Sequence, residues 1–244
     1  MKRNLQTYAL VIFLIIFSVL IYFYQITIFH RPDDTMFYLL QDMAFLPISV
    51  LLVTLGMNTV LNRREHQAKL NRVSVVINEF YAETGIELIQ AFRSSIVNLN
   101  DITMRLELQA GWQDQDFSKL NHFLNQYPLK ADIQTDDLLN LKQVLIKRKD
   151  DLLRLFENAN LVEHDRFTEL LWALYHVYDE LHSRESLTEL PPSDIQHLNL
   201  DIQRAFQKLL IEWVESMRSL QKTYPYLYSL AIRKGLFGQR NIIV

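Results

Sequence analysis

The sequence predicts an all-α protein in which an N-terminal transmembrane helical hairpin precedes a cytoplasmic antiparallel helix bundle. Three observations lead to this prediction. Long apolar runs lie before residue 62, later residues alternate apolar and charged positions at helical spacing, and no segment alternates with the period of a strand. Glycine (5) and proline (6) are scarce among the 244 residues, which also favours helices. We expect the hairpin over residues 1–61 and the bundle over residues 62–244.

The first apolar run extends from Tyr8 to Phe29 and contains no charged residue. A helix of this run, rising about 1.5 Å per residue, is about 33 Å long and matches the hydrocarbon core of a bilayer. A secretory signal peptide is the alternative, but its apolar region is shorter and a small-residue cleavage site follows it. We therefore expect an uncleaved membrane helix over about residues 8–29.

The second apolar run covers about residues 38–61 and follows a short polar connection. Pro47 lies inside this run and removes one helical hydrogen bond, so a kink is expected there. Gly56 lacks a side chain and would permit close approach of another helix. These two residues are the candidate hinge positions of the second membrane helix.

Gln41 and Asp42 are the polar candidates of the second membrane helix. A carboxylate inside the hydrocarbon is costly, so such a residue marks a functional site unless it lies at the membrane surface. We interpret Asp42 as a headgroup-level residue that pairs with Arg31, His30 or the backbone. A polar contact in an oligomer, or an ion-handling site, is the alternative.

Basic residues set the expected orientation of the hairpin. Lys2 and Arg3 precede the first run, and Arg63 and Arg64 follow the second, so both pairs lie on the same side of a hairpin. The positive-inside rule identifies that side as the cytoplasm. The sequence therefore predicts a protein of the cytoplasmic membrane with both termini in the cytoplasm.

Several blocks of sequence resemble a group of bacterial two-helix inner-membrane proteins with a cytoplasmic helical domain. These blocks are Phe37–Pro47, Leu51–Leu55, Arg63-Arg64-Glu65 and Ile77–Gly85. The resemblance implies a bacterial inner membrane as the location. It implies no reaction, substrate, cofactor or functional residue.

The remaining residues are expected to form helices joined by short connections, with residues 113–116 as a polar connection. One long helix continues from the membrane, and Ser193 with Gln196 forms a capping box at the start of the last long helix. Leucines after Thr135 follow heptad-like spacing, which is typical of coiled-coil packing. The expected helices cover 62–98, 100–110, 118–127, a stretch from Thr135, 163–183, and a stretch from Ser193.

Glu79, Glu83 and Glu87 are spaced by four residues and would form a line of negative charge on one helix face. We interpret this line as solvated, or as paired with basic residues of another helix. A divalent-cation or partner site is the alternative.

The densest group of potential metal ligands consists of His176, Asp179, Glu180 and His182, and the Asp-x-x-His spacing recurs at residues 194–197. Di-metal sites in helix bundles use Glu-x-x-His pairs with further glutamates from facing helices. The acid here is aspartate, and the recurrence lies at a helix start. We therefore interpret these as surface residues and assign no metal and no cofactor, with a metal site in the bundle as the alternative.

No catalytic residue is assigned, and the protein is not expected to be an enzyme. The absence of cysteine excludes disulfides and thiolate chemistry, and the net charge of −3 argues against nucleic acid as a partner. We predict a membrane-tethered helical interaction or regulatory protein. Its expected partners are the lipid bilayer, further copies of the chain, or another membrane or cytoplasmic protein. The alternative is a subunit of an oligomeric ion channel or transporter that uses polar residues of the second membrane helix.

Overall fold

The computed structural model describes residues 2–161 and 164–236, and the chain divides into two compact units, Met1–His66 and Gln67–Val244. Every regular secondary-structure element in the described residues is a helix, which confirms the all-α prediction. An isolated antiparallel bridge between Ile96 and Ala131 is the single β-type pairing among these residues.

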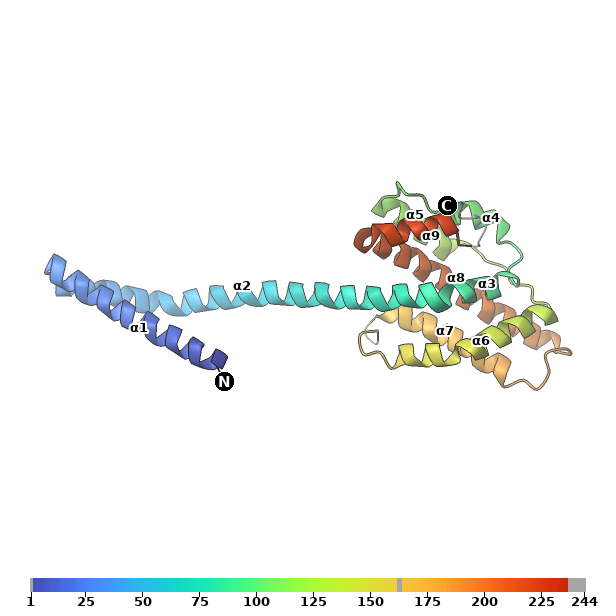
Figure 1. The fold of residues 1–244 in the computed structure, drawn as a ribbon, viewed down its shortest axis with the longest axis horizontal. Helices are drawn as coiled ribbons and strands as arrows, with labels where there is room; N and C mark the ends of the chain where they lie inside the picture. Colours follow the sequence, from blue (N-terminus) through green and yellow to red (C-terminus); the bar gives the residue numbers. More distant parts are fainter. Residues whose placement is uncertain (1, 162–163, 237–244) are drawn as a thin grey trace. The chain divides into compact units, whose positions relative to one another are not determined.

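The first unit contains α1 (Lys2–Phe29) and the first part of α2 (Pro32–Phe80), which reverse direction at His30 and Arg31 (Figure 1). His30 adopts a φ of 53°, a left-handed conformation that is uncommon for residues other than glycine. Its amide nitrogen still donates to the carbonyl of Ile26 at 3.0 Å, which closes the last turn of α1. The reversal is therefore made by a single left-handed residue.

Most of the large apolar side chains that the structure describes in this unit are exposed to solvent. In α2, the most apolar window of 18 residues has a mean hydropathy of 1.9, and 0% of it is buried. The helical stretch Pro32–Arg93 is long and apolar enough to cross a membrane, and the part of α1 whose side chains are described contains the apolar stretch Ile12–Ile28. The first unit thus exposes apolar side chains that the folded chain does not cover.

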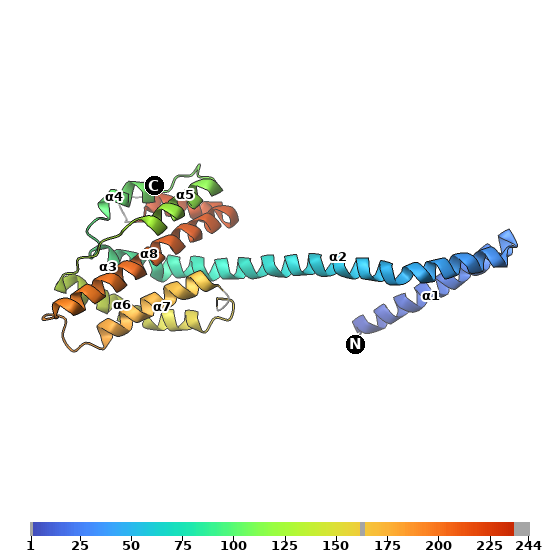
Figure 2. The same cartoon turned by 180° about the vertical axis from the view of Figure 1, so that it is seen from behind.

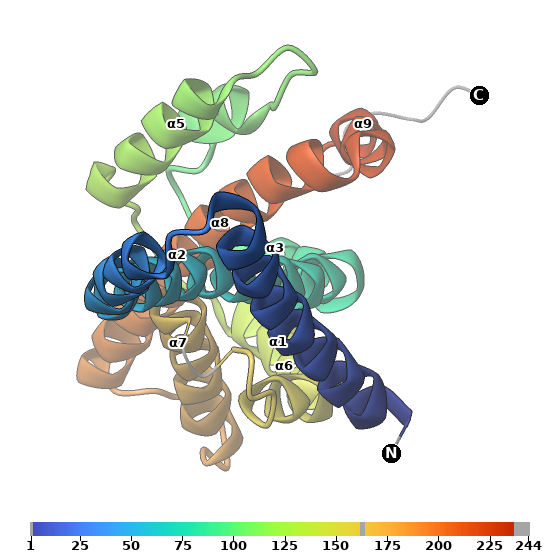
Figure 3. The same cartoon turned by 90° about the vertical axis from the view of Figure 1, so that its left-hand side faces the viewer.

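The second unit is organised around α8 (Pro192–Thr223), which packs against four other helices. The remaining elements are η1 (a π-helix, Tyr81–Gly85), α3 (Ile86–Arg93), α4 (Asn100–Thr103), η2 (a 3₁₀-helix, Met104–Leu106), α5 (Asp114–Gln126), α6 (Thr135–Phe156), α7 (Asp165–His182) and α9 (Pro225–Lys234). In Figures 1 and 2, α6 and α7 lie on one side of α8, and α4, α5 and α9 lie on the other. Figure 3 shows α6 and α7 separated from α5 and α9 in the end-on view.

The apolar stripe of α8 forms the centre of the core. Leu198, Ile202, Phe206 and Leu209 recur at helical spacing, and all four side chains are fully buried. The ring of Phe206 stacks on Phe92 of α3 with 6.4 Å between ring centroids. The predicted apolar face of this helix is therefore the face that the structure buries.

The long helix expected over residues 62–98 is interrupted, which corrects the prediction. The α-helical hydrogen bonding of α2 ends at Phe80, the π-helical turn η1 follows, and α3 ends at Arg93. The hydroxyl group of Tyr81, in η1, donates to the backbone carbonyl of Leu209 at 2.8 Å. The wider π-helical turn thus contains a residue that bonds to a distant part of the sequence. The helical periodicity of the sequence does not predict such a contact.

Two predicted helix starts were wrong. Residues 113–116 are not a connection, because α5 begins at Asp114 and the carboxylate of Asp116 accepts a hydrogen bond from the Gln113 amide at 2.8 Å. Ser193 is not a cap residue, because α8 already begins at Pro192 after Pro191. Proline fits the first turn of a helix, where its missing N–H group would have no intrahelical partner.

Candidate functional site

The polar candidates of the second predicted membrane helix lie on exposed positions of α2. Asp42 pairs with Tyr22 of α1, whose hydroxyl group donates to the carboxylate at 3.4 Å. The expected partner Arg31 instead pairs with Asp34 at 3.4 Å. Gln41 is exposed beside Asp42. The structure therefore gives Asp42 a partner on the neighbouring helix of the same unit.

The hinge and anchor candidates are also found on α1 and α2. The backbone of α2 stays helical through Pro47. A Cβ atom on Gly56 would meet nothing within 4 Å, so the described residues make no close helix contact there. Arg63 and Arg64 are exposed, and the remaining anchor pair, residues 2–3, belongs to the first turn of α1.

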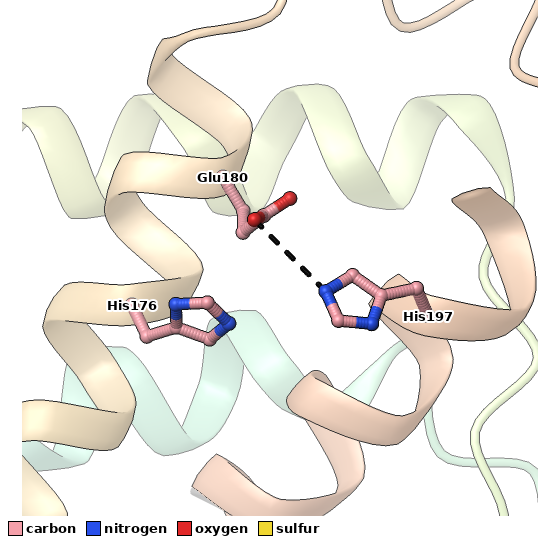
Figure 4. A group of neighbouring side chains, drawn as sticks. All are labelled: His176, Glu180 and His197. Atoms are coloured by element: carbon pink, nitrogen blue, oxygen red, sulfur yellow. Dashed lines mark ion pairs between the residues drawn. The ribbon is translucent and has the colours of Figure 1, made fainter.

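The predicted group around His176 is divided by the structure. His176 and Glu180 lie one turn apart on α7 and point to the same side (Figure 4). Asp179 is exposed outside this group. The ring of His182 stacks on Tyr178 with 5.2 Å between centroids. Two of the four residues that the metal-site alternative grouped are thus brought together, and two are not.

The neighbouring helix α8 completes the group with His197 and Asp201. The Nε2 atoms of His176 and His197 each lie 3.1 Å from the same carboxylate oxygen, Oδ2 of Asp201. The Nε2 atom of His197 also lies 3.9 Å from Oε1 of Glu180, the contact that is dashed in Figure 4. The two imidazoles, from two packed helices, therefore share the carboxylate of Asp201, and Glu180 lies beside His197.

Local sequence explains why these side chains meet. His176 and Glu180 are four residues apart on α7, and His197 and Asp201 are four residues apart on α8, so each pair lies on one face of its helix. Asp201 belongs to the buried stripe of α8, and its side chain is only 4% exposed. A buried carboxylate is costly unless polar groups pair with it, which the two imidazoles do.

In Asp201 and in Glu180, the carboxylate oxygen that does not contact a histidine, called the outer oxygen here, accepts a hydrogen bond from an arginine. Arg204 donates to Oδ1 of Asp201 at 3.0 Å, and Arg184 donates to Oε2 of Glu180 at 2.5 Å. The hydrogen bond from Arg184 lowers the pKa of Glu180, which stays a carboxylate at neutral pH. The other oxygen of each carboxylate thus stays directed at the histidines. The group therefore has the ligand atoms needed to hold a cation.

Sequence reasoning missed Asp201 and gave no role to His197. The usable signal was the repeated His-x-x-x-carboxylate spacing on two neighbouring helices, together with an aspartate on an otherwise apolar stripe. The spacing alone does not say that the two pairs face each other.

The line of glutamates expected in the cytoplasmic part is broken by η1. Glu87 pairs with Lys147 at 2.7 Å and with Arg148 at 2.5 Å, both on α6, and these partners lower its pKa. Glu79 and Glu83 are exposed. Glu87 therefore connects α3 to α6 through these two ion pairs.

An apolar pocket of about 610 Å³ lies in the second unit between the end of α2, η1, α8 and α9. Tyr81, Trp213 and Ala231 are among its lining residues. At its wall, the hydroxyl group of Ser216 donates to Oδ1 of Asn78 at 2.8 Å. This volume is in the range of small-molecule sites, which are mostly apolar with a few polar groups.

Comparisons with known proteins relate both units to one protein family. The family model described as "MJ1433, N-terminal helical domain" matches residues 2–61, and "Uncharacterized protein MJ1433, C-terminal helical domain" matches residues 69–233. Uncharacterized protein MJ1433 of Methanocaldococcus jannaschii is 38% identical over 244 residues, covering 99% of this chain and 98% of that protein. That relative is archaeal, so the comparison does not support the bacterial group. No solved structure matches the chain.

Proposed function

The chain belongs to the MJ1433 family of proteins with two helical domains. We propose that it is a membrane-anchored helical binding protein. In this proposal α1 and the first part of α2 form the anchor, and the second unit is the cytoplasmic module. The observation that carries it is the exposed apolar surface of the first unit, including the fully exposed apolar window of α2.

The exposed side chains support a bilayer as the partner of the first unit. Complete removal of one large apolar side chain from water is favourable by about 1.5–3 kcal/mol. Leu14, Phe23, Phe45 and Leu52 are each more than half exposed, and they lie along both helices. Helices satisfy their own backbone hydrogen bonds, so they can enter lipid without loss.

Charge supports a cytoplasmic location for the second unit. The basic pairs Lys2-Arg3 and Arg63-Arg64 flank the outer ends of the two helices, while the connection at residues 30–36 holds more acids than bases. Membrane proteins keep such basic flanks in the cytoplasm. The second unit follows Arg64 directly and therefore lies on the cytoplasmic side in this proposal.

Membrane extraction tests the anchor. The full chain should stay in the membrane fraction after an alkaline carbonate wash. A Leu51→Arg/Leu52→Arg double variant puts two charges into the apolar window, at a cost of about 5–7 kcal/mol at the helix centre, and should move protein to the soluble fraction. The matched Leu139→Arg/Leu200→Arg variant changes two exposed leucines of the second unit and should stay bound. Release of the unaltered chain by carbonate would refute the anchor.

The pocket favours a second role, binding of a small apolar molecule by the cytoplasmic module. Its walls come from α2, η1, α3, α8 and α9, and its volume of about 610 Å³ suits one amphipathic ligand. Trp213 lines the pocket, so its fluorescence should report on the occupant.

A tryptophan experiment tests the pocket. The Trp112→Phe/Trp172→Phe variant leaves Trp213 as the one remaining tryptophan of the chain. Titration with a medium-chain fatty acid should shift its emission in a saturable way. Ala231→Leu fills part of the pocket and should weaken that response. An unsaturable response, or one that Ala231→Leu leaves unchanged, would remove this role.

The alternative of an oligomeric channel or transporter stays a prediction. No contact of the described residues favours it, because the carboxylate of Asp42 is already engaged by Tyr22 of the same chain. Association with further copies or with another protein also stays a prediction.

A further inference from the structure

We propose that His176, Glu180, His197 and Asp201 form a binding site for one zinc-class transition-metal ion. The site lies within the second unit, between α7 and α8, and it is independent of the anchoring role proposed above. Its role would be structural, because four protein ligands leave no open coordination position at a tetrahedral ion.

The ligand types select the class of metal. Two imidazoles and two carboxylates suit zinc, cobalt or nickel, whereas magnesium and calcium prefer sites made of oxygen ligands alone. The outer oxygens of Asp201 and Glu180 are held by Arg204 and Arg184. Because these two guanidinium groups offset the carboxylate charge, the imidazoles must contribute much of the binding, which also favours a transition metal.

The distances between the ligand atoms fit one ion. Ligands bound to a tetrahedral ion at about 2.0–2.2 Å stand about 3.3–3.6 Å from one another. Both histidine Nε2 atoms lie 3.1 Å from Oδ2 of Asp201. The ligand atoms of His176, Glu180 and His197 all lie within 4.8 Å of one another. Three candidate ligands thus lie close enough together for one ion, and Asp201 contacts both histidines among them.

The groups around the site are arranged as the supporting shell of a metal site. Ligating carboxylates are usually hydrogen-bonded through their other oxygen, which fixes their direction. Arg204 and Arg184 make these bonds here. The side chains of His176 and His197 are 48% and 53% exposed, so an ion can reach them from solvent. Asp201 at 4% exposed forms the inner floor of the site.

Without an ion, the same residues form a hydrogen-bonded ion-pair cluster. The carboxylate of Asp201 then accepts from the two imidazoles and from Arg204. This is the competing account, and metal binding distinguishes the two. A bound ion would replace the imidazole–carboxylate contacts by metal–ligand bonds and would tie α7 to α8.

The test is isothermal titration of the purified full chain, stripped with a chelator, with zinc chloride and then with cobalt chloride. We expect one ion per chain and a higher melting temperature with zinc. His197→Gln should weaken binding by about tenfold or more and should abolish the thermal shift. His197 is exposed, so this variant retains the fold.

His182→Gln is the matched control, because His182 is an exposed histidine of α7 outside the group. It should bind zinc like the unaltered chain. The absence of stoichiometric binding, or an equal affinity in the His197→Gln variant, would overturn the proposal. Equal weakening by His182→Gln would mean non-specific binding to surface histidines and would overturn it as well.

Discussion

The ring of Tyr81 occupies the space that a Cβ atom on residue 85 would need. A Cβ atom built on Gly85 would lie 2.5 Å from Cδ1 and 2.9 Å from Cε1 of Tyr81, closer than side-chain atoms normally approach. The hydroxyl group of Tyr81 is fixed by its hydrogen bond to the carbonyl of Leu209 at 2.8 Å, so the ring cannot easily withdraw. Glycine at position 85 therefore permits this packing in the π-helical turn, a type of turn that is frequent at functional sites.

Gly85→Ala should destabilise the protein by about 1–3 kcal/mol, the usual cost of overpacking a buried site. Urea unfolding of the purified protein measures this loss. Gly111→Ala is the control, because a Cβ atom there meets nothing within 4 Å, and its effect should stay within about 0.5 kcal/mol. Equal effects of the two substitutions would show that the contact with Tyr81 does not constrain residue 85.

The pair of Tyr22 and Asp42 predicts a weak coupling between α1 and α2. The two oxygen atoms lie 3.4 Å apart, and hydrogen bonds between membrane helices contribute about 0.6 kcal/mol on average. A double-mutant cycle of Tyr22→Phe and Asp42→Ala in detergent should give a coupling energy of that size. A coupling energy of zero would mean that the two residues do not interact. The carboxylate of Asp42 would then need another polar partner.

Glu212 predicts a specific pH dependence of stability. Its side chain is 4% exposed and pairs with Arg166 at 2.8 Å, and burial raises its pKa above the usual 4.5 against the opposing effect of Arg166. The folded state then binds this proton more tightly than the unfolded state. Stability from this group is therefore present below about pH 4.5 and is lost as the pH rises through the folded-state pKa.

Glu212→Gln removes this titration, so the variant should gain stability relative to the unaltered chain as the pH rises from about 4.5 towards 8. Denaturant unfolding at several pH values measures the difference. A relative gain by the unaltered chain over that range would mean that attraction to Arg166 outweighs the cost of burial.

Helical periodicity predicted the apolar faces well because it reports directly on burial. The stripe of α8 that includes Leu198, Ile202 and Phe206 is buried as expected. Helix starts were less reliable, because they depend on single residues. Pro192 begins α8 one residue before the expected cap, and the Gln113 amide donates a hydrogen bond to Asp116 that a polar stretch of sequence does not reveal.

The candidate metal site could be predicted only in part, because it depends on how two helices are aligned. The sequence brought His176 and Glu180 together only in the alternative of a metal site, since the preferred interpretation made them surface residues. Their meeting with His197 and Asp201 requires a particular register between α7 and α8, which no local pattern contains. The same reason explains why η1 was missed, since its contact joins Tyr81 to Leu209.

In the proposed topology, two N-terminal helices anchor the protein and keep its second unit in the cytoplasm. The chain contains no cysteine, so single cysteines can be placed at the exposed positions Asp33 and Asp136 and labelled selectively. In intact cells that express the full chain, a membrane-impermeant maleimide should label Asp33→Cys and should label Asp136→Cys only after permeabilisation. Labelling of Asp136→Cys in intact cells, with Asp33→Cys protected, would contradict the account.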